Sequence, residues 1–101
     1  MVAPRKETPS RETGPKFPLG SIVATPGALG ALTHDELLAA LGRHVRGEWG
    51  DLCEEDVKEN ELSLREGFRL LSVYHSLKGV KFYVITEADR SVTTLLLPEE
   101  Y

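Results

Sequence analysis

Two polar segments contain residue types that can carry acid–base or phosphate chemistry, and the first surrounds His44. An imidazole oriented by the carboxylate of Asp51 or Glu54 across the intervening loop would be a general base. The structural interpretation is a histidine on the inward face of a helix, near its C-terminal end, where the helix dipole favours the charged form. Trp49 would then fill the gap between two helices. We favour the structural interpretation and keep His44 as a catalytic candidate, with Trp49 and Asp51 as binding candidates.

The second polar segment is the turn at 86–94. Here the guanidinium of Arg90 would clamp a phosphate, with hydroxyl donors from the neighbouring serine and threonine side chains. The alternative is local turn chemistry, in which Asp89 and Ser91 bond their own backbone and Arg90 pairs with Glu87. The candidate binding residues of this segment are Asp89, Arg90, Ser91 and Thr93.

A third group is basic and lies on the strands and turns of the C-terminal third. Lys78 and Lys81 surround a predicted hairpin turn with His75, and Arg69 would complete a patch on one sheet face. Such charges also keep exposed strands soluble, which is the ordinary interpretation. Nucleic acid, if bound, would be contacted by the N-terminal tail or by Arg69, Lys78, Lys81 and Arg90. A sequence pI near 5.3 argues against a general nucleic-acid binder.

No metal or cofactor is predicted. The histidines His34, His44 and His75 fall in separate elements without metal-site spacing, and the sequence has no Gly-rich phosphate loop. Cys53 is the one cysteine, which excludes a disulfide framework. It falls on the inward stripe of a predicted helix, so we expect it to be a buried packing residue.

Composition bounds the class of protein. The chain has 101 residues, a net charge of −4 and 41% hydrophobic residues, which is typical of one small globular domain. No apolar run reaches the ~18 residues of a membrane span, and the first residues do not resemble a secretory signal. We expect a cytoplasmic protein that does not contact a membrane.

The chain divides into a tail and a domain. Residues 1–16 are rich in proline and charge, which predicts a disordered basic tail before a single domain at 17–101. The domain begins with a predicted edge strand at 19–24, which a Pro-Gly turn ends. The Thr-His-Asp-Glu sequence is a capping box, and it starts a predicted helix at 33–46.

A second helix is predicted between a cap at Asp51 and a left-handed glycine at Gly67. Its inward stripe consists of Cys53, Val57, Asn60 and Leu64. From residue 48 to residue 67, eight acidic residues face two basic ones, a net charge of −6. Such carboxylates can imitate DNA phosphates, as in an anti-restriction protein, although most acidic helix faces are simply solvated.

The last third changes from helical to strand periodicity. Alternating apolar and polar residues predict strands at 68–75, 80–86 and 92–97, joined by short turns and therefore antiparallel. The predicted fold class is α+β in the order β-α-α-β-β-β. Two helices are expected to pack on a three- to four-stranded antiparallel meander.

Four stretches cover most of the chain after the tail: FPLGSIVATPGAL (17–29), RHVRGEWGDL (43–52), VITEADRSVTT (84–94) and LPEEY (97–101). They resemble a family of small bacterial proteins of plasmids and integrative elements, some of them labelled "type I restriction endonuclease subunit M". The resemblance implies a mobile-element, restriction-associated context and no catalytic residues. A methylation subunit needs a methyl-donor fold and an Asn/Asp-Pro-Pro-aromatic motif. The chain has neither a Pro-Pro pair nor a Gly-x-Gly loop, so it is not an autonomous DNA methyltransferase.

Together these features predict a non-enzymatic accessory or interaction protein of a bacterial mobile element, with another protein as partner. An exposed apolar patch in which Trp49 or Tyr101 is prominent would favour this function. The alternative is a small metal-free ribonuclease of the RelE or barnase type, in which a base and an arginine meet in one concave site. The candidates for these two roles are His44, Arg69, Glu87 and Arg90.

Overall fold

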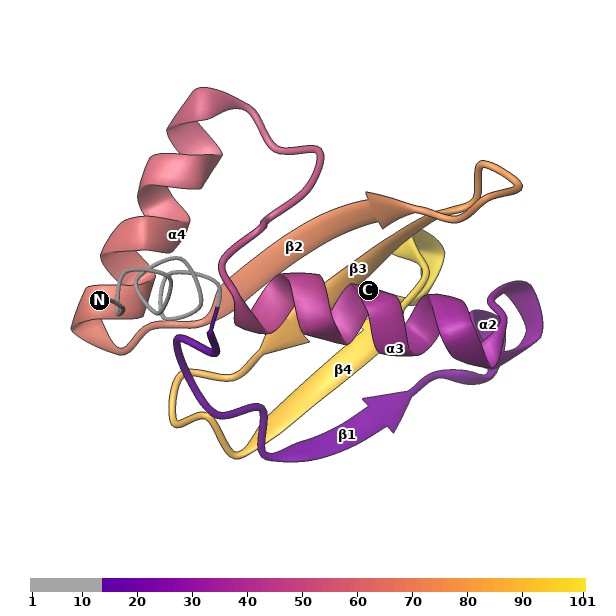
Figure 1. The fold of residues 1–101 in the computed structure, drawn as a ribbon, viewed down its shortest axis with the longest axis horizontal. Helices are drawn as coiled ribbons and strands as arrows, with labels where there is room; N and C mark the ends of the chain where they lie inside the picture. The colour runs from indigo at the N-terminus through magenta and orange to yellow at the C-terminus, as the bar shows by residue number, and fades with distance from the viewer. Residues whose placement is uncertain (1–13) are drawn as a thin grey trace, which may run out of the picture.

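The computed structural model describes residues 14–101 (Figure 1). The predicted basic tail falls mainly on residues 1–13, which lie outside the described residues. In chain order the elements are β1 (Ser21–Ala24), α2 (Pro26–Ala31), α3 (His34–Val45), α4 (Glu54–Glu66), β2 (Leu70–His75), β3 (Lys81–Thr86), β4 (Val92–Leu96) and the 3-10 helix η1 (Pro98–Glu100). The predicted α+β class is confirmed.

The four strands form one mixed sheet in the order β1-β4-β3-β2. The predicted meander of the last three strands is confirmed, since β2 pairs with β3 and β3 with β4 in antiparallel fashion. The first strand corrects the prediction of an all-antiparallel sheet. It runs parallel to β4, with Ser21 opposite Val92 and Ala24 opposite Leu95. No hairpin joins strands so distant in the sequence, so no local pattern fixes their relative direction.

The helix predicted from the capping box is confirmed as α3. Thr33 Oγ1 accepts from the Glu36 N–H at 3.1 Å, and Glu36 Oε1 accepts from the Thr33 N–H at 2.8 Å. A helix that was not predicted, α2, precedes it, capped by Thr25 with Pro26 in its first turn. The Pro-Gly pair was predicted to be a turn. Proline suits the first helical position, because its φ is that of a helix and its missing N–H would have no partner there.

The helix α4 ends as predicted at Gly67, whose φ of 80° is left-handed. It begins later than predicted, because its N-cap is Cys53 and not Asp51. Asp51 lies in a loop beside β2, where its N–H donates to the Val73 carbonyl at 2.7 Å. Cys53 is therefore exposed at the helix start, and the prediction of a buried cysteine is wrong.

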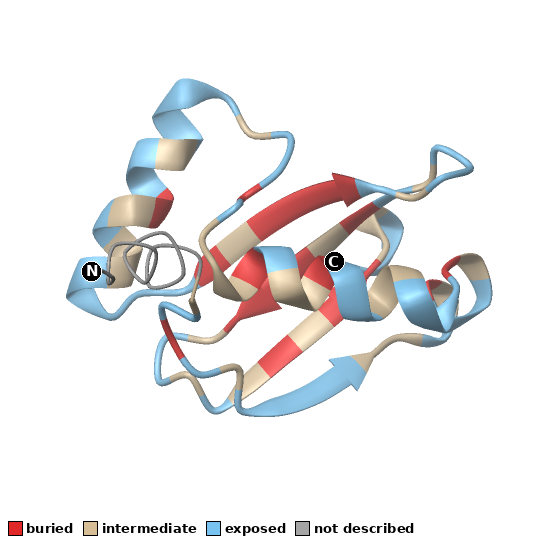
Figure 2. Cartoon of the chain, in the orientation of Figure 1, coloured by how far each residue is buried: buried red, intermediate tan, exposed pale blue. Residues whose placement is uncertain are grey.

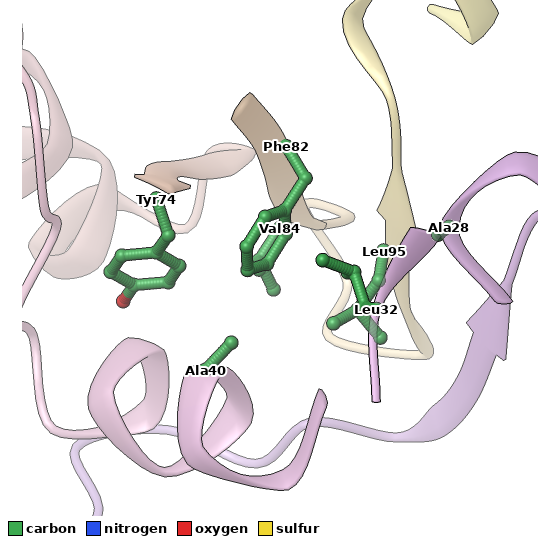
Figure 3. Close-up of a cluster of buried hydrophobic side chains, with 7 residues drawn as sticks. All are labelled: Ala28, Leu32, Ala40, Tyr74, Phe82, Val84 and Leu95. Carbon is green, nitrogen blue, oxygen red and sulfur yellow. The ribbon is translucent and has the colours of Figure 1, made fainter. Parts of the chain in front are cut away.

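Two helices, α2 and α3, cover one face of the sheet, and α4 stands beside the start of β2 (Figure 1). The main buried cluster lies between these helices and the sheet (Figure 3), and it consists of Ala28, Leu32, Ala40, Tyr74, Phe82, Val84 and Leu95. A smaller cluster of Phe17, Trp49 and Leu70 joins α4 to the sheet, and Val57 and Leu64 of the predicted inward stripe pack against it. Burial is concentrated in β2, β3 and β4, whereas β1 is mostly exposed (Figure 2).

Candidate functional site

His44, on α3, takes part in a continuous chain of hydrogen bonds between α3 and the sheet. Its side chain is fully buried. Nδ1 lies 2.6 Å from Ser72 Oγ and Nε2 lies 2.9 Å from Thr86 Oγ1, both on the underlying sheet. The chain continues from Thr86 to Thr93 at 2.7 Å, and the Thr93 hydroxyl donates to the Leu19 carbonyl at 2.7 Å.

The last of these bonds sets the direction of the others. Because the Thr93 hydroxyl gives its proton to a carbonyl, it accepts from Thr86, which in turn accepts from His44. Nε2 therefore carries the ring proton, and Nδ1 accepts from the Ser72 hydroxyl. The neutral imidazole uses both of its ring nitrogens inside the protein.

Burial keeps His44 neutral and out of reach of a substrate. Loss of hydration first, and the positive charge of Arg90 second, lower its pKa to about 4. The rings of Phe17 and Trp49 lie edge-on to it, at centroid distances of 5.3 and 5.7 Å. Ser72 is fully buried as well, so the hydroxyl–imidazole pair cannot act as a nucleophile. The predicted carboxylates do not orient the ring, and the expectation that the helix end favours its charged form is wrong.

Arg90 also has a structural role, because its guanidinium bonds backbone carbonyls of the same chain. Its φ of 62° is in the left-handed region. Its guanidinium donates at 2.7–3.2 Å to four backbone carbonyls, those of Ser63, Phe68, Glu87 and Ala88. These bonds tie the β3–β4 turn to the end of α4. The guanidinium therefore serves the protein's own backbone, and the predicted phosphate clamp is not assembled.

Two substitutions of Arg90 separate the effect of its hydrogen bonds to the carbonyls from the effect of its left-handed backbone. Arg90→Ala removes the carbonyl bonds and leaves a left-handed φ that alanine adopts poorly, whereas Arg90→Gly loses the same bonds but relieves the backbone. We expect the free energy of unfolding to fall by about 2 kcal/mol in Arg90→Ala and about 1 kcal/mol in Arg90→Gly. Urea denaturation measures both values, and equal losses would contradict the strain assigned to this backbone.

The turn beside Arg90 follows the local interpretation only in part. As predicted, Asp89 accepts from the Ser91 N–H at 3.0 Å, and the hydrogen bonds from Ser91 lower the pKa of Asp89. Glu87 pairs with Arg69 instead of the neighbouring arginine, at 3.4 Å. Arg69 also donates to the Tyr101 hydroxyl at 3.1 Å. Among the catalytic candidates, this exposed pair is the one grouping of a carboxylate with an arginine that the structure brings together.

The predicted basic patch is not assembled. Lys78 and Lys81 lie with His75 at the β2–β3 turn, whereas Arg69 and Arg90 lie at the other end of the same strands. A six-residue strand spans about 20 Å. The two pairs of cations therefore cannot contact one phosphate together.

Trp49 is only 4% exposed, so it does not belong to the exposed apolar patch that was predicted for a docking protein. The structural interpretation, in which Trp49 fills a gap next to a helix, agrees better with its contacts. The ring stacks near Phe17 with centroids 6.3 Å apart, and Nε1 donates to the Glu61 carboxylate at 2.8 Å. Tyr101, the other predicted docking residue, is 72% exposed.

Asn60, a buried residue of α4, takes the place of a neighbouring strand beside β2. Its Nδ2 donates to the Leu71 carbonyl at 2.5 Å, and its Oδ1 accepts from the Leu71 N–H at 3.1 Å. Asn60→Ala leaves both backbone groups without this partner, so we expect the free energy of unfolding to fall by about 2–3 kcal/mol. In urea denaturation the exposed control Glu59→Ala should change it by about 0.5 kcal/mol at most. Similar effects in the two variants would exclude this role for Asn60.

A groove between α3 and β2 was not predicted. Two adjoining hollows of about 410 and 420 Å³ share Arg43, Tyr74 and His75. The remaining lining residues are Thr33, Asp35, Glu36, Ala39, Ala40, Ser76, Leu77 and Phe82 in the first hollow, and Glu48, Trp49, Gly50, Asp51 and Val73 in the second. We call these surfaces together the α3–β2 groove. No spacing in the sequence marks the groove, because its walls meet only when the hairpin folds against α3.

Hydrogen bonds and stacking hold the walls of the α3–β2 groove in place. Glu36 Oε2 accepts from the Leu77 N–H at 2.8 Å, which joins the helix start to the hairpin turn. Backbone hydrogen bonds, that of Thr33 first and that of Leu77 second, lower the pKa of Glu36. The Arg43 guanidinium lies 4.5 Å from the centre of the Tyr74 ring, a cation–π contact.

The charges of the groove are mostly acidic. Its carboxylates belong to Asp35, Glu36, Glu48 and Asp51, against the single guanidinium of Arg43. His75 Nδ1 lies 3.9 Å from the Asp51 carboxylate. Between these charges the first hollow has apolar walls, which include Ala39 and Phe82. This combination suits the binding of an extended segment that carries apolar and basic side chains.

Within residues 14–101, no cluster of histidine, cysteine, aspartate or glutamate side chains is placed to hold a metal ion. In the same part of the chain, every helix is too short or too polar to cross a membrane. Comparison of the chain with protein-family models, with curated proteins and with solved structures gave no match.

Proposed function

We propose that this chain is a non-enzymatic accessory protein of a bacterial mobile element, which acts in the cytoplasm by holding a segment of a partner protein in the α3–β2 groove. The observation that carries the proposal is the way its polar groups are divided. His44 and Arg90 are engaged inside the protein. Arg43, His75 and Asp51 instead face an open concave surface. The mobile-element context rests on the sequence resemblance.

The chemistry of the groove describes the expected partner. Arg43 already has Tyr74 and Glu48 as neighbours, the Glu48 carboxylate lying 3.5 Å from its Nε. The other carboxylates of the groove, those of Asp35, Glu36 and Asp51, have no further lysine or arginine among the lining residues, so a basic side chain of the partner gains the most there. Apolar side chains of the same segment would cover the wall at Phe82. The partner segment is therefore mixed, with lysine or arginine next to apolar residues.

Site-specific crosslinking tests this proposal. A photoreactive residue in place of Ala39, exposed in the groove, should capture one protein at defined stoichiometry from cells that carry the parent element. The same residue in place of Leu62, on the outer surface of α4, is the matched control. Adding Asp35→Lys and Asp51→Lys should weaken the capture about tenfold, because both changes repel a basic segment. Equal capture at both positions, or capture that ignores the charge reversal, would contradict the proposal.

A ribonuclease remains the second candidate because of the Arg69–Glu87 pair. A carboxylate beside a guanidinium can serve as base and phosphate ligand. Against it, neither residue lines the α3–β2 groove, and about half of the Arg69 side chain is exposed. RNA cleavage that disappears in Glu87→Gln and in Arg69→Ala, but persists in Glu59→Gln, would replace the docking proposal with this one.

The acidic helix has less support as a DNA mimic. Glu61 is engaged by the Trp49 indole, and Lys58 lies among the outward carboxylates of α4. An anti-restriction protein of this kind should compete with DNA for a restriction complex. Replacing Glu55 and Glu59 by glutamine would then weaken the competition.

A further inference from the structure

The two edge strands of the sheet differ in whether their outward backbone groups have hydrogen-bond partners. On β2, the outward groups of Leu71 and Val73 do. The N–H and C=O of Leu71 are bonded by the Asn60 amide. At Val73 the partner is the loop before α4. The Val73 N–H donates to the Trp49 carbonyl at 3.0 Å, and the Asp51 N–H donates to the Val73 carbonyl at 2.7 Å. Side chain and loop thus occupy the positions that another strand would use.

The β1 edge has no such cover among the described residues. The N–H groups of Ser21 and Thr25 donate inward, to the carbonyls of Ser91 at 2.9 Å and Leu95 at 3.0 Å. Because inward and outward groups alternate along a strand, the N–H and C=O of Ile22 and Ala24 point away from the sheet. No described element lies beyond β1 on this side (Figure 1).

The side chains of β1 also lack the features that protect an edge strand. The strand reads Ser-Ile-Val-Ala, without a charge or a proline. Ile22 is 47% exposed on the helix side of the sheet and Val23 is 46% exposed on the opposite face. An exposed Leu38 adds to the apolar surface on the helix side. On α3 it projects away from the α3–β2 groove, about 160° around the helix from Glu36.

We propose that β1 pairs with β1 of a second copy of this chain, in antiparallel direction, to form one continuous eight-stranded sheet. The register follows from the outward groups. Ile22 of each copy faces Ala24 of the other, which gives four hydrogen bonds between the chains, and Val23 faces its own equivalent across the two-fold axis.

The side chains fit this register. The large Ile22 lies opposite the small Ala24 on the helix face, and the two Val23 side chains form a β-branched pair on the other face. The uncharged strand brings no like charges together, so a second copy is an acceptable partner for it.

The size of the contact sets its strength. A stable interface buries roughly 1,200 Å² in total, and two four-residue strands are too short to supply that area. The pairing is therefore weak, with a dissociation constant in the micromolar to millimolar range. It uses the edge opposite the α3–β2 groove, so it is independent of the function proposed for that groove.

Cysteine crosslinking of the full chain tests the register. In a Cys53→Ser background, Val23→Cys places two thiols opposite each other at about 4.5 Å between Cα atoms, within the range of a disulfide. Ser21→Cys is the matched control, on the same strand and face, but its thiols lie two residue pairs from the axis. We expect oxidation to give a covalent dimer with Val23→Cys and none with Ser21→Cys. Equal crosslinking of the two variants, or none in either, would overturn the proposal.

Charge substitution gives an independent measurement in solution. Sedimentation velocity from micromolar to millimolar concentration should show a monomer–dimer equilibrium, and Val23→Lys should weaken it at least about tenfold because two lysines then face each other. A mixture of Val23→Lys with Val23→Glu should restore it, since opposite charges meet at the axis. Leu62→Lys, at an exposed site of α4 outside the α3–β2 groove, should leave this equilibrium unchanged. A monomer at every concentration, or a dimer insensitive to Val23, would refute the pairing, and so would occupation of this edge by a different protein.

Discussion

Lowering the pH from 7 to 4 should reduce the free energy of unfolding by about 3 kcal/mol through His44 alone. Its pKa is about 4 in the folded protein, against the ordinary histidine value of 6.5 in the unfolded chain. Between these values the unfolded state binds the extra proton, so stability is complete above pH 6.5 and is lost as the pH falls toward 4. The physical reason is that the charged imidazolium would lose its hydration in this buried site and would also lie near the positive charge of Arg90.

Urea denaturation at a series of pH values measures this effect, with His44→Gln as the control. Glutamine can bond both hydroxyl neighbours but does not titrate, so the variant should be less stable at pH 7 and nearly constant down to pH 5. Glu36, Asp89 and Glu100, whose pKa values hydrogen bonds lower, titrate below that range. Parallel curves for wild type and His44→Gln between pH 7 and pH 5 would show that His44 is not buried in its neutral form.

Trp49→Ala should lower the free energy of unfolding by about 3–5 kcal/mol, the largest loss expected from one side chain. The indole separates His44 from solvent, packs on Phe17 and satisfies the Glu61 carboxylate. Its removal leaves a cavity that the short loop to α4 cannot fill. Circular dichroism during urea denaturation gives the value without relying on the fluorescence of the only tryptophan.

The same substitution carries a second readout, the titration of His44. When the indole is gone, water reaches the imidazole, and its pKa should rise toward its ordinary value in an NMR titration. Trp49→Phe is the control, because a ring still covers His44 and only the bond to Glu61 is lost. We expect Trp49→Phe to lower the free energy of unfolding by about 1 kcal/mol and to leave the pKa of His44 low. A His44 pKa that stays low in Trp49→Ala would mean that the indole does not exclude water.

The parts of the fold that local chemistry determines were predictable. The capping box at Thr33, the left-handed stop at Gly67 and the alternation in the three C-terminal strands each depend on a few neighbouring residues. The parallel direction of β1 depends on a strand far away in the sequence. The helix α2 was missed because Pro-Gly serves equally well as a turn and as a helix start.

The site was less predictable, for a related reason. The position of His44 on the inward face of α3 could be predicted, and so could the inward positions of Ser72 and Thr86 on their strands. A buried imidazole needs partners, and hydroxyl groups at inward strand positions were the available signal for them. The α3–β2 groove gave no comparable signal. Its walls come from a helix and a hairpin whose contact only the tertiary fold establishes.

The amide of Asn60 has a consequence for how far an assembly of this protein can grow. When two copies join through β1, the new sheet has two outer edges, and both are β2 strands whose outward backbone groups at Leu71 and Val73 are already bonded by Asn60 and by the loop before α4. No further copy can add to either end in the same way. Assembly then stops at a closed pair with two-fold symmetry, so a strand as apolar as Ser21–Ala24, which no described element covers, does not seed a fibril.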